Sequence, residues 1–346
     1  MPDNIITRDE KKEIRKSYSF SGTTLLIFLV VYFFLAKPIV NAAASLFITE
    51  ADYNTFVTIG SIVLIIIAEI SAILLGSKFC GINLRSLFNI GGFSGKTIAK
   101  SYFAAQGLGY IASFFISLII VFFTLFANLS PGTFTPNIVE RMNESGLVPA
   151  FTAFYAIIFA PFLEELLFRG IILGSLSRYN RTFAIIISAI AFGFTHGNIQ
   201  QACYSMIAGI VFAAVDLRYN SIIPSIISHS FINIFGMISS FFMKATGYSE
   251  TAEKMLSMTN PFEMIKLITP QMIVVMLILF AVITAFIITA IVIVIKNKNR
   301  FREFFIPVTE WNKSRALPIL LTSIPWILCF AVLIYEVFIR PFWTFI

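Results

Sequence analysis

Charged side chains are scarce in this chain. They make up 12% of its 346 residues, whereas 58% of the residues are hydrophobic, and ordinary soluble domains carry about 25% charged residues. This composition excludes an ordinary soluble domain. The apolar residues form continuous runs of about 20, the length at which a helix crosses a hydrocarbon core. Because the runs do not alternate with polar residues, they favour membrane-spanning helices over a barrel.

Several signatures of hydrolases and transporters are also missing. The sequence has no His-Glu-x-x-His helix for zinc and no Gly-x-Ser-x-Gly elbow around a serine. Asp216 is the only aspartate near a span, which argues against an aspartyl dyad. The absence of a convincing internal repeat argues against an inverted-repeat transporter. The three cysteines, Cys80, Cys203 and Cys329, lack metal-ligand spacing and are expected to be packing residues.

The hydrophobic runs predict an all-α, polytopic membrane protein with about nine transmembrane helices. The expected spans are residues 20–47, 56–77, 101–127, 149–176, 182–198, 201–217, 221–243, 269–296 and 317–339. Basic residues precede the first span and follow the second, fourth, sixth and eighth, a bias typical of cytoplasmic segments. We therefore expect a multi-pass plasma-membrane protein with a cytoplasmic N-terminus. The same bias accounts for the net charge of +7, so the expected partner is the lipid bilayer and not a nucleic acid.

The middle of the chain differs from its two flanks. Residues 1–148 are expected to form a cytoplasmic N-terminus and three peripheral transmembrane helices, and residues 149–243 a four-helix catalytic core. Residues 244–346 are expected to form an external loop and two further peripheral helices. The flanking spans are rich in Phe, Ile, Leu and Val, as helices that face lipid are. In the core, Gly193 and Gly197 have the spacing that lets helix backbones approach closely.

Three short motifs place polar side chains inside apolar segments of this core, where ionisable groups are costly and usually functional. Together they contain both histidines of the chain. They are Glu164-Glu165-Leu166-Leu167-Phe168-Arg169, Phe192-Gly193-Phe194-Thr195-His196 and His229-Ser230-Phe231-Ile232-Asn233. Each alone also fits a structural role, as a charge cluster, a packed histidine or a polar clamp between helices. Their occurrence on neighbouring helices with short connections favours a functional site.

Helical geometry separates the two glutamates of the first motif. Glu165 and Arg169 are four residues apart and share a face, so we expect an ion pair between them. Glu164 points about 100° away and is free to face a cavity. Pro161 removes a backbone hydrogen bond and is expected to kink the helix near the carboxylates.

The residue types of the three motifs suit hydrolysis. A carboxylate and an imidazole held out of water can bind and deprotonate a water molecule. His229 and Asn233 are four residues apart on one face and can both donate hydrogen bonds to a developing oxyanion. Phe192 is expected to pack against His196, four residues later. The reaction that these groups favour is hydrolysis of a peptide bond within the membrane.

The ordered set of motifs resembles the CPBP family of intramembrane proteases, which includes the CAAX prenyl endopeptidases and Abi-type bacterial proteins. The family pattern is Glu-Glu-x-x-x-Arg, then Phe-x-x-x-His, then His-x-x-x-Asn, and the resemblance covers residues 150–240. It implies that Glu164 and His196 activate the water and that His229 and Asn233 stabilise the oxyanion. It also implies supporting roles for Glu165, Arg169 and Phe192. The family mechanism is glutamate-dependent and requires no metal or other cofactor.

Other interpretations remain open from the sequence. Two histidines and a glutamate are also ligands that zinc accepts. The chain could be a non-catalytic membrane scaffold, a bacteriocin-immunity or regulatory protein that binds a partner, or a proton-coupled transporter that uses Glu164 and His196 as a relay. For a protease, the expected partner is a membrane-embedded peptide or protein substrate. The sequence indicates neither its cleavage site nor the oligomeric state of the chain.

Overall fold

The computed structural model describes residues 8–47, 50–127, 147–248, 251, 254, 261–299 and 316–340. Within these residues the chain is helical and contains no β-strand; a single isolated bridge joins Phe88 to Ser221. The first half of the chain forms α1 (Arg8–Val30), η1 (Val31–Leu35), α2 (Ala36–Phe47), α3 (Glu50–Cys80), η2 (Leu84–Leu87) and α4 (Gly95–Ala127).

The second half contains one long, interrupted helix followed by shorter ones. The interrupted helix comprises α6 (Leu147–Phe154), η4 (Tyr155–Phe159), α7 (Ala160–Glu165), η5 (Leu166–Leu173) and α8 (Gly174–Leu176), in which η4 and η5 are π-helical. After it come α9 (Arg181–Phe194), α10 (Ile199–Tyr219), α11 (Ile223–Ala245), α13 (Pro261–Lys266), α14 (Pro270–Lys296), α17 (Ala316–Leu321), α18 (Ile324–Ile334) and η6 (Tyr335–Ile339).

The helices confirm an all-α, multi-pass membrane protein. Within the described part of the chain, six helices are long and apolar enough to cross a membrane. They are Arg8–Leu35, Tyr53–Cys80, Gly95–Phe122, Ile199–Tyr219, Ile223–Ala245 and Pro270–Lys296. The apolar helices Arg181–Phe194 and Ile324–Ile339 are shorter, and the helix over residues 147–176 is interrupted. The count of nine spans therefore stays a prediction. The proposed C-terminal anchor at residues 341–346 and most of the expected external loop lie outside the described residues.

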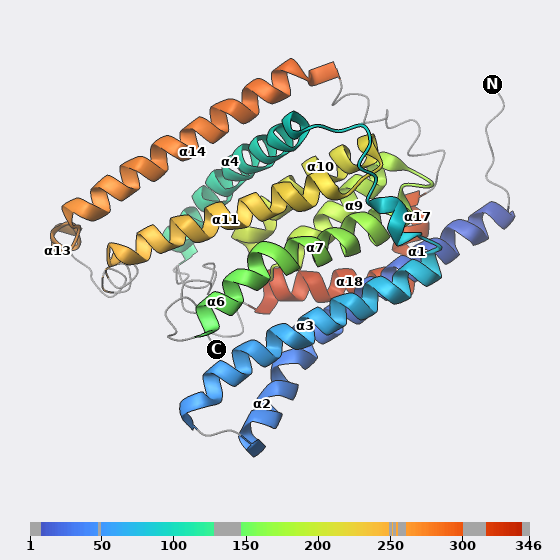
Figure 1. The fold of residues 1–346 in the computed structure, drawn as a ribbon, viewed down its shortest axis with the longest axis horizontal. Coiled ribbons are helices and arrows are strands. Elements are labelled where there is room, and N and C mark those ends of the chain that lie inside the picture. The colour runs from blue at the N-terminus through green and yellow to red at the C-terminus, as the bar shows by residue number, and fades with distance from the viewer. Residues whose placement is uncertain are drawn as a thin grey trace.

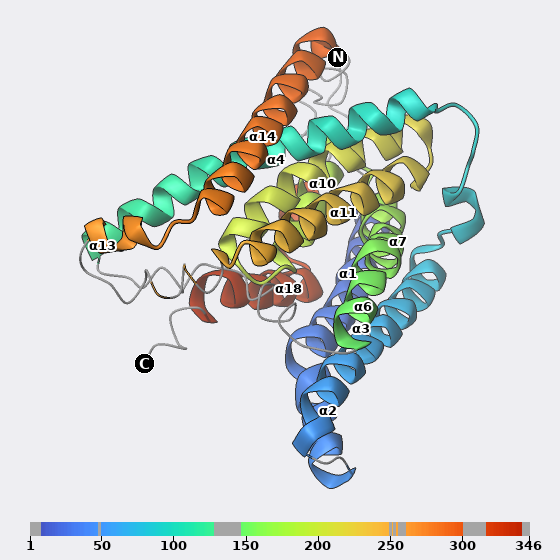
Figure 2. The same ribbon diagram turned by 60° about the vertical axis from the view of Figure 1, so that its left-hand side comes forward.

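The helices that carry the three motifs pack on one another in the middle of the bundle (Figures 1 and 2). Helix α10 packs against both α9 and α4, and α11 packs against α7 and α4. A Cβ atom added to Gly193 would lie 2.5 Å from the carbonyl oxygen of Ala202, so α9 and α10 touch through their backbones. Gly197 was predicted to let helix backbones approach closely. Instead its φ of +69° lets the chain turn from α9 into α10.

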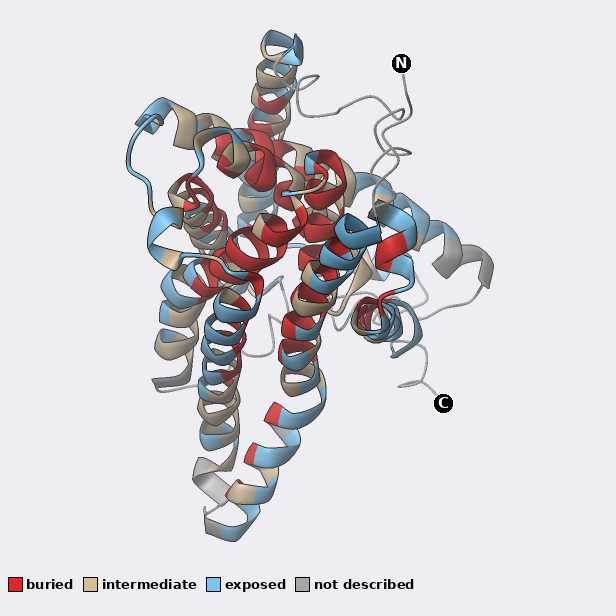
Figure 3. Cartoon of the chain, turned by 90° about the vertical axis from the view of Figure 1, so that its right-hand side faces the viewer, coloured by how far each residue is buried: buried red, intermediate tan, exposed pale blue. Residues whose placement is uncertain are grey.

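Burial is concentrated where these helices meet, whereas the outer helices expose apolar side chains (Figure 3). Helix α14 fits the expectation of a lipid-facing helix, since only three of its 27 residues are buried. Helix α1 is more buried than the sequence predicted. Its Tyr18, Leu25 and Leu29 are inaccessible, and the backbone oxygen of Tyr18 accepts a 2.9 Å hydrogen bond from Nε1 of Trp326 in α18. The first and last helices therefore close the core together.

Candidate active site

The backbone that carries the two glutamates is shaped by Pro161. In the preceding π-helical segment, the N–H of Ala160 donates to the oxygen of Tyr155, five residues earlier. The next N–H in that register would bond the oxygen of Ala156, but residue 161 is proline and has none. The side-chain amide Nδ2 of Asn233 donates to this oxygen instead, at 2.6 Å. The proline thus releases a carbonyl that ties the third motif to the first.

Glu165 and Arg169 form the ion pair that their spacing predicted. Oε2 of Glu165 lies 3.0 Å from Nε of Arg169, and both side chains are completely buried. The guanidinium lies 4.2 Å from the ring centre of Phe192 and 5.7 Å from that of Phe212. Arginine is suited to this position because its planar cation can stack on aromatic rings as well as pair with a carboxylate. The pair therefore connects the first motif to α9 and α10.

The position of Arg169 depends on a glycine, Gly209, in the facing helix α10. A Cβ atom added to Gly209 would lie 3.1 Å from Nη2 of Arg169 and 3.2 Å from Cα of Ala189. Such distances are tighter than ordinary van der Waals contact, so only glycine leaves room for both the guanidinium and α9.

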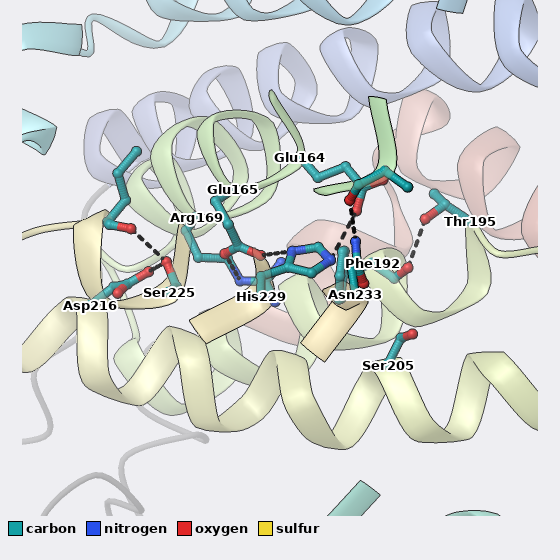
Figure 4. Close-up of polar contacts among 12 residues, drawn as sticks. Glu164, Glu165, Arg169, Phe192, Thr195, Ser205, Asp216, Ser225, His229 and Asn233 are labelled. Carbon is teal, nitrogen blue, oxygen red and sulfur yellow. Dashed lines mark hydrogen bonds and ion pairs between the residues drawn. The ribbon is translucent and has the colours of Figure 1, made fainter. Parts of the chain in front are cut away.

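His229 lies between the two glutamates, as Figure 4 shows. Its Nδ1 is 3.0 Å from Oε1 of Glu165, and its Nε2 is 3.9 Å from Oε2 of Glu164. A carboxylate paired with arginine only accepts hydrogen bonds, so Nδ1 of His229 must carry the proton that it donates to Glu165. In the neutral ring, Nε2 then presents a lone pair towards Glu164. Arg169, Glu165 and His229 therefore form one chain of contacts that ends at Glu164.

The environments of the two glutamates differ as the helical geometry predicted. The side chain of Glu165 is inaccessible and has contacts on both oxygens, whereas that of Glu164 is 21% exposed. Oε2 of each glutamate lacks a hydrogen-bond partner among the described residues, but that of Glu165 lies 3.0 Å from the Arg169 cation, whereas that of Glu164 has only the 3.9 Å contact with His229. Glu164 is thus the carboxylate of the two whose side chain keeps exposed surface and is not held by a close cation.

His196 lies in the turn after α9, beside Phe192. Its Nδ1 is 3.0 Å from the backbone oxygen of Phe192, an acceptor, so this nitrogen is the donor. Its Nε2 lies 3.3 Å from Oγ of Ser205 in α10. The Phe192 ring packs edge-on against both His196 and His229, with ring centres 5.3 and 5.6 Å apart.

The expected pairing of His196 with Glu164 is not a direct contact. No salt bridge or hydrogen bond joins these two described residues, and His229 is the histidine that lies within 4 Å of Glu164. Helical spacing alone could not distinguish the two imidazoles, because His196 lies in the turn after α9 and His229 in α11, both outside the helix that carries the glutamates.

Two buried acidic residues near the site were given no role from the sequence. Asp216 in α10 accepts a 2.6 Å hydrogen bond from Oγ of Ser225 in α11 (Figure 4). Glu69 in α3 is 1% exposed and interacts electrostatically with Glu164. An ionisable residue within a hydrophobic span is itself a signal of function, and applying it to residues 56–77 would have found Glu69.

The acidic and histidine side chains of the site lie close together, but in the described part of the chain they do not form a metal-binding cluster. No group of three or more His, Cys, Asp or Glu residues there has the arrangement to hold a metal ion.

These features define a multi-pass membrane protein with a buried carboxylate–imidazole site. Its sequence is similar to those of proteins described as peptidases. Residues 146–235 match the family model described as "Type II CAAX prenyl endopeptidase Rce1-like". The chain is also 35% identical over 82 residues to the Bacillus subtilis (strain 168) protein "Putative membrane peptidase YdiL". No solved structure matches.

The matches confirm, for the segment that carries the motifs, the resemblance to CPBP-family proteases. They support assignment of the protein to the general class of proteases. The alignment with the Bacillus subtilis protein covers 23% of this chain and 34% of that relative, so the chain spans about a third of the relative's length.

Replacing Arg169 with methionine is expected to destabilise the protein strongly, because Glu165 would stay buried without its cation. Losing one partner of a buried pair costs about 3–5 kcal/mol. The double variant Glu165→Leu/Arg169→Met is expected to recover part of this loss. Unfolding of the purified variants in one detergent measures the effect, with Arg178→Gln, an exposed arginine, as the control. Additive losses in the double variant would show that the pair is not coupled.

Proposed function

We propose that this protein is an intramembrane endopeptidase that hydrolyses a peptide bond with a water molecule activated by Glu164. The observation that carries the proposal is the contact chain from Arg169 through Glu165 and His229 to a half-buried Glu164. The match of residues 146–235 to the endopeptidase family supports it independently.

In this proposal Glu164 is the general base. Its carboxylate takes a proton from water while the water oxygen attacks the substrate carbonyl, and the proton then passes to the leaving amine. His196 would hold the water through Nε2, because its Nδ1 donates to the backbone oxygen of Phe192. Oγ of Ser205 now lies 3.3 Å from this nitrogen, and the water would replace it as the hydrogen-bond partner of Nε2.

His229 and Asn233 would stabilise the oxyanion of the tetrahedral intermediate. An asparagine amide has two hydrogens, and Asn233 uses one of them on the oxygen of Ala156. The second remains for the substrate. His229 can donate from Nε2 only as an imidazolium, for which Glu165 at 3.0 Å would be the counter-ion. Phe192 would keep the two imidazoles apart, since its ring contacts both.

The proposed substrate is a membrane-embedded peptide or protein, since the site lies among helices able to span a membrane. The plasma membrane and a cytoplasmic N-terminus remain part of the proposal, on the distribution of basic residues.

The variant Glu164→Gln is expected to fold normally and to lose most activity, because the amide has a similar shape and cannot act as a base. General-base catalysis contributes roughly 10²–10⁴-fold to rate. Cleavage is measured by mass spectrometry on proteoliposomes that contain membrane peptides from the host cell. Glu263→Gln, an exposed acid in α13, is the matched control. Full activity of Glu164→Gln, or biological function kept without cleavage, would contradict the proposal, and the latter would favour a scaffold.

The variant Pro161→Ala is expected to lower activity without loss of stability. Alanine restores an N–H that can bond the oxygen of Ala156, and this N–H competes with the Asn233 amide for the acceptor that now orients it. The measurements are the cleavage rate and the thermal unfolding of the same preparation. Pro270→Ala at the start of α14 is the control, since that proline also occupies a first helical turn. Unchanged activity of Pro161→Ala would show that the released carbonyl does not position Asn233.

A further inference from the structure

A cavity of about 200 Å³ lies away from the candidate active site, between α4, α10 and α14. The start of α4 and the ends of α10 and α14 meet at one end of the molecule (Figure 1). All three helices are long and apolar enough to cross a membrane. If these helices span the bilayer, their ends and the cavity between them lie at the depth of the lipid headgroups.

The walls of the cavity carry positive charge. Lys96, Lys100 and Arg218 line it, and no acidic residue does so in the described part of the chain. None of the three forms a salt bridge with a described residue. Lys296 lies beside Lys100 in an adjoining hollow. An anion in the cavity would supply the missing counter-charge.

A buried hydroxyl provides a second, independent indication of a ligand. Ser101 is 2% exposed and lines the cavity, yet its Oγ has no hydrogen-bond partner among the described residues. Buried polar atoms in native proteins are nearly always paired. The first turn of α4 lies at the same place, where Ser94 and Thr97 also line the cavity, and the N-terminus of a helix favours an anion through the helix dipole.

The cavity changes in polarity with depth. Lys96 and Arg218 are exposed, whereas Ala104, Val211 and Ala214 are 2%, 4% and 7% exposed and form an apolar wall. A free phosphate would use only the charged part. A ligand with a phosphate and an adjoining apolar portion would use both.

We propose that this cavity binds the phosphate group of an acidic glycerophospholipid, with the phosphate against Lys100, Arg218 and Ser101 and the glycerol and upper acyl chain against the apolar wall. The site is distinct from the candidate active site, although α10 contributes to both. Phe212 of α10 faces Arg169 and His229, whereas Val211 and Arg218 line the cavity. The proposal does not depend on the protease activity.

The test is native mass spectrometry of the purified full chain in detergent. The probes are phosphatidylglycerol, phosphatidylcholine with the same acyl chains, and inorganic phosphate. Phosphatidylglycerol is expected to bind the wild type more tightly than phosphatidylcholine. Neutralising two cations in Lys100→Gln/Arg218→Gln should weaken its binding by roughly 30-fold, since each basic residue near an anionic surface contributes about 1 kcal/mol. Lys78→Gln/Arg181→Gln, with the same charge change at exposed positions outside the cavity, should bind as the wild type does.

Two further variants separate binding from folding. Ser101→Ala removes one hydroxyl and should weaken phosphatidylglycerol binding several-fold, whereas Arg218→Lys should retain most of it. Thermal unfolding without lipid checks that each variant is folded. Equal binding of both lipids, or unchanged binding in Ser101→Ala and in the double variant, would overturn the proposal. Binding of inorganic phosphate without binding of phosphatidylglycerol would overturn the lipid assignment.

Discussion

The structure depends above all on burying one cation, Arg169, in the middle of a helical membrane bundle. An isolated charge at this depth is costly, and the surrounding residues offset that cost. Glu165 supplies the opposite charge at 3.0 Å, and the rings of Phe192 and Phe212 flank the guanidinium. Gly209 leaves the room. Because these groups come from three parts of the chain, the cation fixes how the core helices pack.

The same pair gives the candidate site its chemistry. Glu165 is occupied by Arg169 and His229 on its two oxygens, so it can orient the imidazole but is not free to react. Glu164, the preceding residue, has only a 3.9 Å contact with Nε2 of His229 and keeps 21% of its side chain exposed. Glu164 and Glu165 are adjacent and chemically identical, but the helix directs their side chains into different surroundings. Their roles therefore differ.

The sequence predicted the parts of the site that depend on local geometry. Four-residue spacing predicted the pair of Glu165 and Arg169 and the contact between Phe192 and His196, and both are present. Hydropathy predicted the membrane helices. The contact of His229 with Glu165, 64 residues away, follows from tertiary packing and has no signal in either motif alone. The π-helical segments that surround Glu165 were also not predicted, because hydrophobic periodicity does not distinguish a π-helix within a longer helix.

The arrangement of the site depends on Glu165 holding His229 with the proton on Nδ1. The chain has only two histidines, so ¹⁵N NMR of histidine-labelled His196→Gln protein reports His229 alone. We expect a proton on Nδ1, and we expect Glu165→Leu to remove this preference. A neutral ring with its proton on Nε2 in the presence of Glu165 would contradict the account.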